Sequence, residues 1–105
     1  MVKTKMKTGG YSSESADEYV IPEIPSQVLS VELEGMAEYV DGKRTKNIVA
    51  YRAWFSQQGL GPFQVKFLKK ISLPPYLSEV VFEGLEAVEV HHNVYFRAQN
   101  ISEVK

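Results

Sequence analysis

Apolar and polar side chains alternate residue by residue along much of this chain, a period of two that indicates β-strands rather than helices. The clearest case is the segment FQVKF, in which Phe63, Val65 and Phe67 alternate with Gln64 and Lys66. Successive side chains of a strand point to opposite faces, so one of these sets is buried and the other meets water. We therefore expect an all-β fold with Phe63, Val65 and Phe67 in its core.

Turn signals divide the alternating sequence into five expected strands. Asp41-Gly42 is the strongest hairpin signal, because a type I′ turn needs positive φ at both central residues. Gly35 and Gly84 interrupt longer runs and predict bends or bulges within single strands. The Pro-Pro pair at Pro74 predicts one helical turn between the third and fourth strands, since proline is tolerated at the first helical position. The five runs are residues 28–40, 47–55, 63–73, 79–90 and 94–104.

The number and shape of these strands predict a small barrel. A chain of 105 residues fits one domain. Five strands, with the first and fourth strongly bent, are typical of a five-stranded OB-like β-barrel. We expect this domain to span residues 25–105. An SH3-like barrel and an open β-sandwich are the alternatives.

The N-terminal residues 1–24 differ in composition from the rest of the chain. They are rich in Ser, Gly and mixed charges, a composition that buries too little apolar surface to offset the entropy of ordering it. We expect a flexible N-terminal arm here, disordered over residues 1–18. Tyr19, Val20, Ile21 and Ile24 are apolar exceptions, and the adjacent prolines favour an extended strap that lies against the domain.

Charge and cysteine content exclude several classes of protein. The net charge is −1, but residues 27–70 carry +3 and residues 71–105 carry −3, so only the middle third attracts phosphate. The absence of cysteine excludes disulfide frameworks, thiolate metal sites and cysteine nucleophiles. No apolar run approaches the roughly 18 residues of a membrane helix or follows the basic start as a leader would. We expect a soluble, cytoplasmic protein.

Patterns that indicate catalysis or cofactor binding are weak. His91 and His92 are neighbours, so regular strand geometry points them to opposite faces rather than to one metal ion. The GLGP loop lacks the lysine and the following helix of a phosphate-binding loop. We expect a non-enzymatic protein without metal or cofactor. The glutamates of the fourth run are expected to form a solvated rim, comprising Glu79, Glu83, Glu86 and Glu89.

Basic and aromatic side chains gather in the middle third. In an OB-type barrel the second and third strands form the face on which bases stack and phosphates are tracked. Arg52 and Trp54 share one face of the second strand, a planar cation beside a planar ring that suits stacking. The sequence leaves open whether Trp54 belongs to the core or to this face. The candidate nucleic-acid-binding residues are Lys43, Arg44, Lys46, Tyr51, Arg52, Trp54, Lys66, Lys69 and Lys70.

The order of these elements resembles a known family. The segments YRAWFSQQGLGPFQVKFLKKISLP, EVVFEGLEAVEV and VYFRAQNI resemble the small proteins of Gram-positive integrative conjugative elements that help a helicase unwind element DNA, and related accessory proteins of plasmids and cassette elements. The resemblance covers residues 48–104 and depends on fold-shaping positions such as Gly59, Gly61 and Pro74. It implies an OB-like domain that acts as a non-catalytic accessory in DNA replication or transfer.

Two functions from different classes follow from these observations. The first is a single-stranded DNA-binding accessory protein for replication or transfer of a mobile genetic element, with a helicase or another replication protein as a possible partner. The second is a protein-interaction adaptor without nucleic-acid binding, which uses an exposed strand edge or the strap near residues 20–25. The +3 charge of the middle third favours DNA, whereas the near-neutral net charge favours the adaptor.

Overall fold

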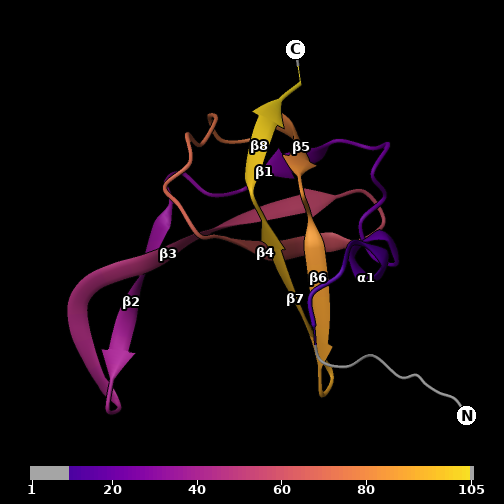
Figure 1. Ribbon diagram of the computed structural model, residues 1–105. Coiled ribbons are helices and arrows are strands. Elements are labelled where there is room, and N and C mark those ends of the chain that lie inside the picture. The colour runs from indigo at the N-terminus through magenta and orange to yellow at the C-terminus, as the bar shows by residue number, and fades with distance from the viewer. Residues whose placement is uncertain (1–9, 105) are drawn as a thin grey trace, which may run out of the picture.

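The computed structural model describes residues 10–104, which form a predominantly β structure (Figure 1). The elements are α1 (Ser13–Asp17), β1 (Ser26–Val28), β2 (Glu34–Val40), β3 (Lys43–Gln57), β4 (Gly61–Phe67), β5 (Glu79–Glu83), β6 (Glu86–Val90), β7 (Asn93–Ala98) and β8 (Asn100–Glu103). The strands join in one sheet in the order β6-β7-β4-β3-β1-β5-β8, and β2 pairs with β3. No helix within residues 10–104 is long and apolar enough to cross a bilayer.

The all-β prediction is confirmed, but the five-stranded closed barrel is wrong. The described chain forms an open sheet of eight strands instead. The difference arises because the first, fourth and fifth expected strands are each divided into two, as β1 and β2, β5 and β6, and β7 and β8. Alternation of side chains persists across a break in pairing, so it does not reveal where one strand ends and the next begins.

β1 ends at Val28, and a side-chain hydrogen bond two residues later explains why the backbone ladder does not continue. The backbone N–H of Leu29 still donates to the carbonyl of Trp54 at 2.8 Å, but the N–H of Trp54 donates to the Ser30 hydroxyl at 2.8 Å. A side-chain oxygen thus replaces the next backbone acceptor of the ladder. Val31, which lies inside the first expected strand (residues 28–40), is 87% exposed.

The strands β5, β6, β7 and β8 form a C-terminal ribbon that bends at Gly84, as predicted. Gly84 has a φ of +68°, a conformation that glycine adopts without a steric penalty. On one side of the bend β5 pairs with β8, and on the other β6 pairs with β7. The same ribbon joins the rest of the sheet twice, because β5 pairs with β1 and β7 pairs in parallel with β4.

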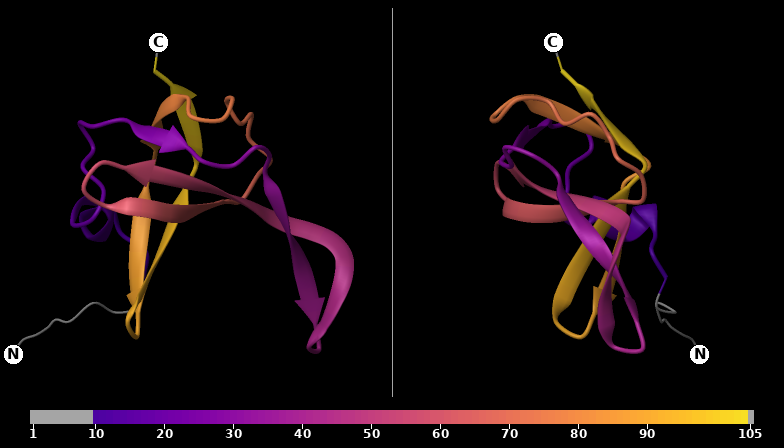
Figure 2. Two further views of the ribbon diagram at one scale, coloured as in Figure 1. Left: turned by 180° about the vertical axis from the view of Figure 1, so that it is seen from behind. Right: turned by 90° about the vertical axis from the view of Figure 1, so that its left-hand side faces the viewer.

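β2 and the first half of β3 form a hairpin, here called the arm (residues 34–50), that extends away from the other strands (Figures 1 and 2). Asp41 and Gly42 form its turn with φ values of 53° and 77°, which confirms the predicted hairpin. The irregular register of β2 lies between Met36 and Tyr39 rather than at Gly35. The second half of β3 pairs with β4 and β1, so β3 connects the arm to the body of the sheet.

The core contains the residues that alternation assigned to it. Phe63, Val65 and Phe67 are all buried, which confirms the predicted faces of this strand. Phe55 is fully buried, with its ring centroid 6.2 Å from those of Phe63 and Phe67 and 5.0 Å from that of Phe82. The aromatic cluster therefore joins β3, β4 and β5.

The N-terminal segment contacts the core earlier than the expected domain start at residue 25. Ser12 and Ala87 exchange two backbone hydrogen bonds of 3.0 Å, and Ala16 and Val20 are buried. The Gln57 side chain holds the backbone of the following strap through hydrogen bonds to residues 21 and 24. The polar composition of residues 10–24 does not reveal this packing, in which Ala16 of α1 and Val20 after the helix both enter the core. Residues 1–9 lie outside the described part of the chain.

The expected helical turn after Pro74 is wrong. The segment forms a tight turn instead, in which the N–H of Ser78 donates to the Pro75 carbonyl at 3.0 Å. The N–H of Leu77 donates to the carbonyl of Val28 at 2.7 Å, and Leu77 has a φ of 71°. The bond to Val28 directs this N–H to β1 and away from a helical partner.

Candidate functional site

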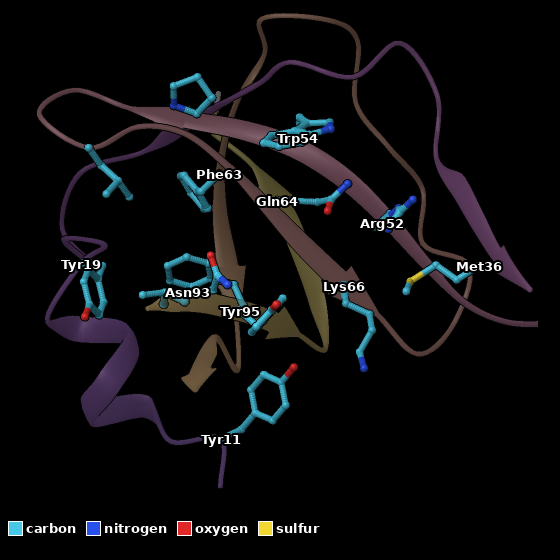
Figure 3. A pocket seen from close by; sticks show the side chains of 14 residues that line it. Tyr11, Tyr19, Met36, Arg52, Trp54, Phe63, Gln64, Lys66, Asn93 and Tyr95 are labelled. Carbon is cyan, nitrogen blue, oxygen red and sulfur yellow. The ribbon is translucent and has the colours of Figure 1, made fainter. Parts of the chain in front are cut away.

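A groove opens on the surface where β4 and β7 separate (Figure 3). The two strands pair only over Val65–Phe67 and Phe96–Ala98, and the residues that precede these ranges diverge. The resulting groove has a volume of about 600 Å³, within the range of small-molecule sites. Its lining is rich in aromatic side chains and also carries amides and cations.

The register of the sheet arranges the outward side chains in rows. One charged row crosses from β3 to β6 and consists of Arg52, Lys66, Arg97 and Glu86. The next row begins with Trp54 opposite Gln64. Tyr95 lies two residues before Arg97 on β7 and therefore shares the same face. The groove thus has an aromatic row beside a charged row.

Trp54 lies on this outer face and not in the core. Its side chain is 45% exposed, whereas the next residue, Phe55, is completely buried. Trp54 and Tyr95, which is 49% exposed, both line the groove. An exposed indole and an exposed phenol in one groove provide flat apolar surfaces for a planar ligand.

Arg52 is engaged by a carboxylate rather than free. Its Nε donates to Glu34 Oε1 at 2.8 Å and its Nη2 donates to Oε2 at 3.0 Å. These hydrogen bonds, and then the charge of Arg52, hold the pKa of Glu34 below its usual value, and the bond to Glu34 raises the pKa of Arg52. Arg52 and Trp54 thus lie on the same face of β3 and line the same groove, but Glu34 partly neutralises the charge of Arg52.

Tyr11 is a groove residue that the sequence analysis missed, because it lies in the segment expected to be disordered. The guanidinium carbon of Arg97 lies 4.1 Å from the centroid of its ring, and the ammonium of Lys66 lies 6.0 Å from it. Arg97 Nε in turn donates to Glu86 Oε1 at 2.9 Å. Tyr95 was missed as well, although its alternation with buried Phe96 marks it as outward-facing.

The structure brings together only part of the predicted basic and aromatic set. Arg52, Trp54 and Lys66 line the groove. Tyr51 lies on the opposite face of β3, half-buried and paired with Phe67. The remaining cations lie outside the groove, with Lys43, Arg44 and Lys46 near the tip of the arm and Lys69 and Lys70 in the loop after β4.

Three of the four glutamates expected to form a rim have specific side-chain partners. Glu86 pairs with Arg97, and Glu83 accepts a hydrogen bond from the Ser102 hydroxyl at 2.7 Å. Glu89 accepts a hydrogen bond from the Tyr19 hydroxyl, and this bond raises the pKa of Tyr19. These contacts hold neighbouring segments together.

His91 and His92 form the exposed turn between β6 and β7. Within residues 10–104, no group of three or more His, Cys, Asp or Glu side chains is placed to hold a metal ion.

Comparison of the chain with protein-family models, with curated proteins and with solved structures gave no match.

Proposed function

We propose that this chain is a non-enzymatic single-stranded DNA-binding protein that assists replication or transfer of a mobile genetic element. The observation that carries the proposal is the pair of half-exposed rings, Trp54 and Tyr95, beside Lys66 in one groove. Aromatic platforms next to a cation suit single strands, since bases stack on the rings while phosphates meet the charge. Duplex bases keep their faces covered by their neighbours and do not offer them to such rings.

The proposed division of labour follows the positions of the side chains. Trp54 and Tyr95 stack bases, each contact contributing about 1–3 kcal/mol. Lys66 is the groove cation for a phosphate, because Arg52 and Arg97 are already paired with Glu34 and Glu86. Lys43, Arg44 and Lys46 on the arm extend the basic surface beyond the groove. The resemblance of residues 48–104 to helicase accessory proteins of conjugative elements supports a helicase or other replication protein as partner.

The adaptor function has one supporting observation, which lies on the arm. Tyr39, Val40, Ile48 and Val49 are all exposed there. A sheet edge with apolar side chains suits addition of a strand from another protein. If the parent protein does not bind DNA in the experiment below, the adaptor function replaces DNA binding as the proposal.

Fluorescence anisotropy with labelled oligothymidine at two salt concentrations tests the proposal. We expect Trp54→Ala to weaken binding about five- to a hundredfold without changing the salt dependence, because stacking releases no counterions. Lys66→Ala should weaken binding and reduce the salt slope by about 0.7, the value for one phosphate contact on a single strand. Absence of binding by the parent protein at low salt, or tighter binding to duplex, would contradict the proposal.

A further inference from the structure

The N-terminal segment places an aromatic ring at the groove through well-defined contacts. Ser12 is fixed by its two backbone hydrogen bonds to Ala87 on β6. Its side chain also accepts a hydrogen bond from the N–H of Ser15 at 3.1 Å and so caps α1. The residue before it, Tyr11, is therefore held beside the outer face of the sheet.

The Tyr11 ring is oriented by a chain of charged groups. Glu86 holds Arg97 at 2.9 Å, and the guanidinium of Arg97 lies over the Tyr11 ring at 4.1 Å from its centroid. A guanidinium this close to a ring is an attractive cation–π contact. Arg97 is thus engaged by Glu86 and Tyr11 together, an arrangement that orients the ring rather than offering a free cation to phosphate.

We infer that Tyr11 contacts a base of the bound strand and that Arg97 is the positioning residue for it. In Figure 3, Trp54 and Tyr11 lie on opposite sides of the groove with Tyr95 between them. These three rings form an aromatic path across β3, β4 and β7, with Lys66 beside it. The ligand is accordingly a short stretch of single strand whose bases face the protein. This inference rests on the proposed function.

The base contact is separated from phosphate contacts by comparing two probes of equal length and charge, oligothymidine and an abasic deoxyribose-phosphate oligomer. We expect Tyr11→Ala to weaken oligothymidine binding about five- to a hundredfold and to leave abasic binding unchanged. Tyr11→Phe, which keeps the ring, should bind as the parent does. Tyr76→Ala is the control, since Tyr76 is an exposed tyrosine that lies outside the groove.

Arg97→Gln tests the positioning role. We expect it to weaken oligothymidine binding about as much as Tyr11→Ala, with an unchanged salt slope. The double variant, Tyr11→Ala with Arg97→Gln, should bind oligothymidine no more weakly than either single variant, because both substitutions remove one shared contact. A direct phosphate contact by Arg97 would instead weaken binding to both probes equally and lower the salt slope, which would overturn the positioning role.

The outcomes distinguish this inference from the proposed function. If Tyr11→Ala binds oligothymidine as the parent does while Trp54→Ala does not, the Tyr11 contact is wrong and DNA binding stands. If the parent binds neither probe, both proposals fail. If a thermal melt shows that Tyr11→Ala is unfolded, Tyr11→Leu, which keeps apolar bulk without an aromatic face, replaces it and is expected to lose the same base-dependent affinity.

Discussion

Trp54 and Phe55 are neighbours on β3 and meet opposite environments, one 45% exposed and the other fully buried. Strand parity produces this contrast, and it recurs on β4, where Lys66 lines the groove and Phe67 is buried in the core. At the scale of single residues, the faces of β3 and β4 therefore separate positions that stabilise the fold from positions available to a ligand.

The paired substitutions Phe67→Ala and Lys66→Ala test these faces. We expect Phe67→Ala to lower the free energy of unfolding by about 3–5 kcal/mol, because it removes a fully buried ring that contacts Phe55. Lys66→Ala should change it by less than about 0.5 kcal/mol, as is usual for surface positions. Chemical denaturation provides both values. Equal midpoints for the two variants would mean that the faces of β4 are reversed.

Residue-level prediction from the sequence succeeds where only one face is apolar and fails where both are. In β4 the alternation of Phe63, Val65 and Phe67 with polar residues leaves one solution, and the structure has it. In β3 both sets of alternating side chains contain apolar and aromatic residues, so Trp54 was undetermined. Tyr11 was beyond reach, because its place depends on pairing with residues more than seventy positions away.

At the scale of elements, residues 12–20 pack against the sheet. α1 contributes Ala16 to the core, and Val20 follows it there. Local composition did not reveal this, since the stabilising contacts are long-range. The bend at Gly84, by contrast, was predictable, because a glycine inside an otherwise regular strand pattern has a local conformational cause.

Two truncations test the contribution of this segment to stability. Removing residues 1–20 deletes buried Ala16 and Val20 together with the Ser12–Ala87 hydrogen bonds. We expect the melting temperature to fall by about 10 °C or more, since 1 kcal/mol corresponds to roughly 4–8 °C in a domain of this size. Removing residues 1–9 is the control, because it keeps every contact described for the segment. A melting temperature for the longer truncation that matches the parent would show that these contacts add nothing.

At the scale of the whole molecule, counting strands could not establish the architecture. The sheet depends on pairings between distant segments, namely β4 with β7 and β1 with both β3 and β5. A sequence contains no local signal for such pairings. Five alternating runs are compatible with several ways of joining the strands into a barrel or a sheet. The groove opens where β4 and β7 diverge from their short parallel pairing, so the site was as unpredictable as the topology.

The basic tip of the arm and the groove are separate parts of one proposed binding surface, and this separation predicts a dependence on ligand length. We expect a triple variant, Lys43→Gln with Arg44→Gln and Lys46→Gln, to lower the salt slope by about 2 for oligomers of about 15 nucleotides and by nothing for about 5 nucleotides, since known single-strand sites span about 4–16 nucleotides. The melting temperature should stay unchanged, because all three side chains are at least partly exposed and outside the core. Lys69→Gln with Lys70→Gln, in the loop after β4, is the charge-removal control and should leave both slopes unaltered. An unchanged slope for the triple variant on the longer oligomer would confine the proposed site to the groove.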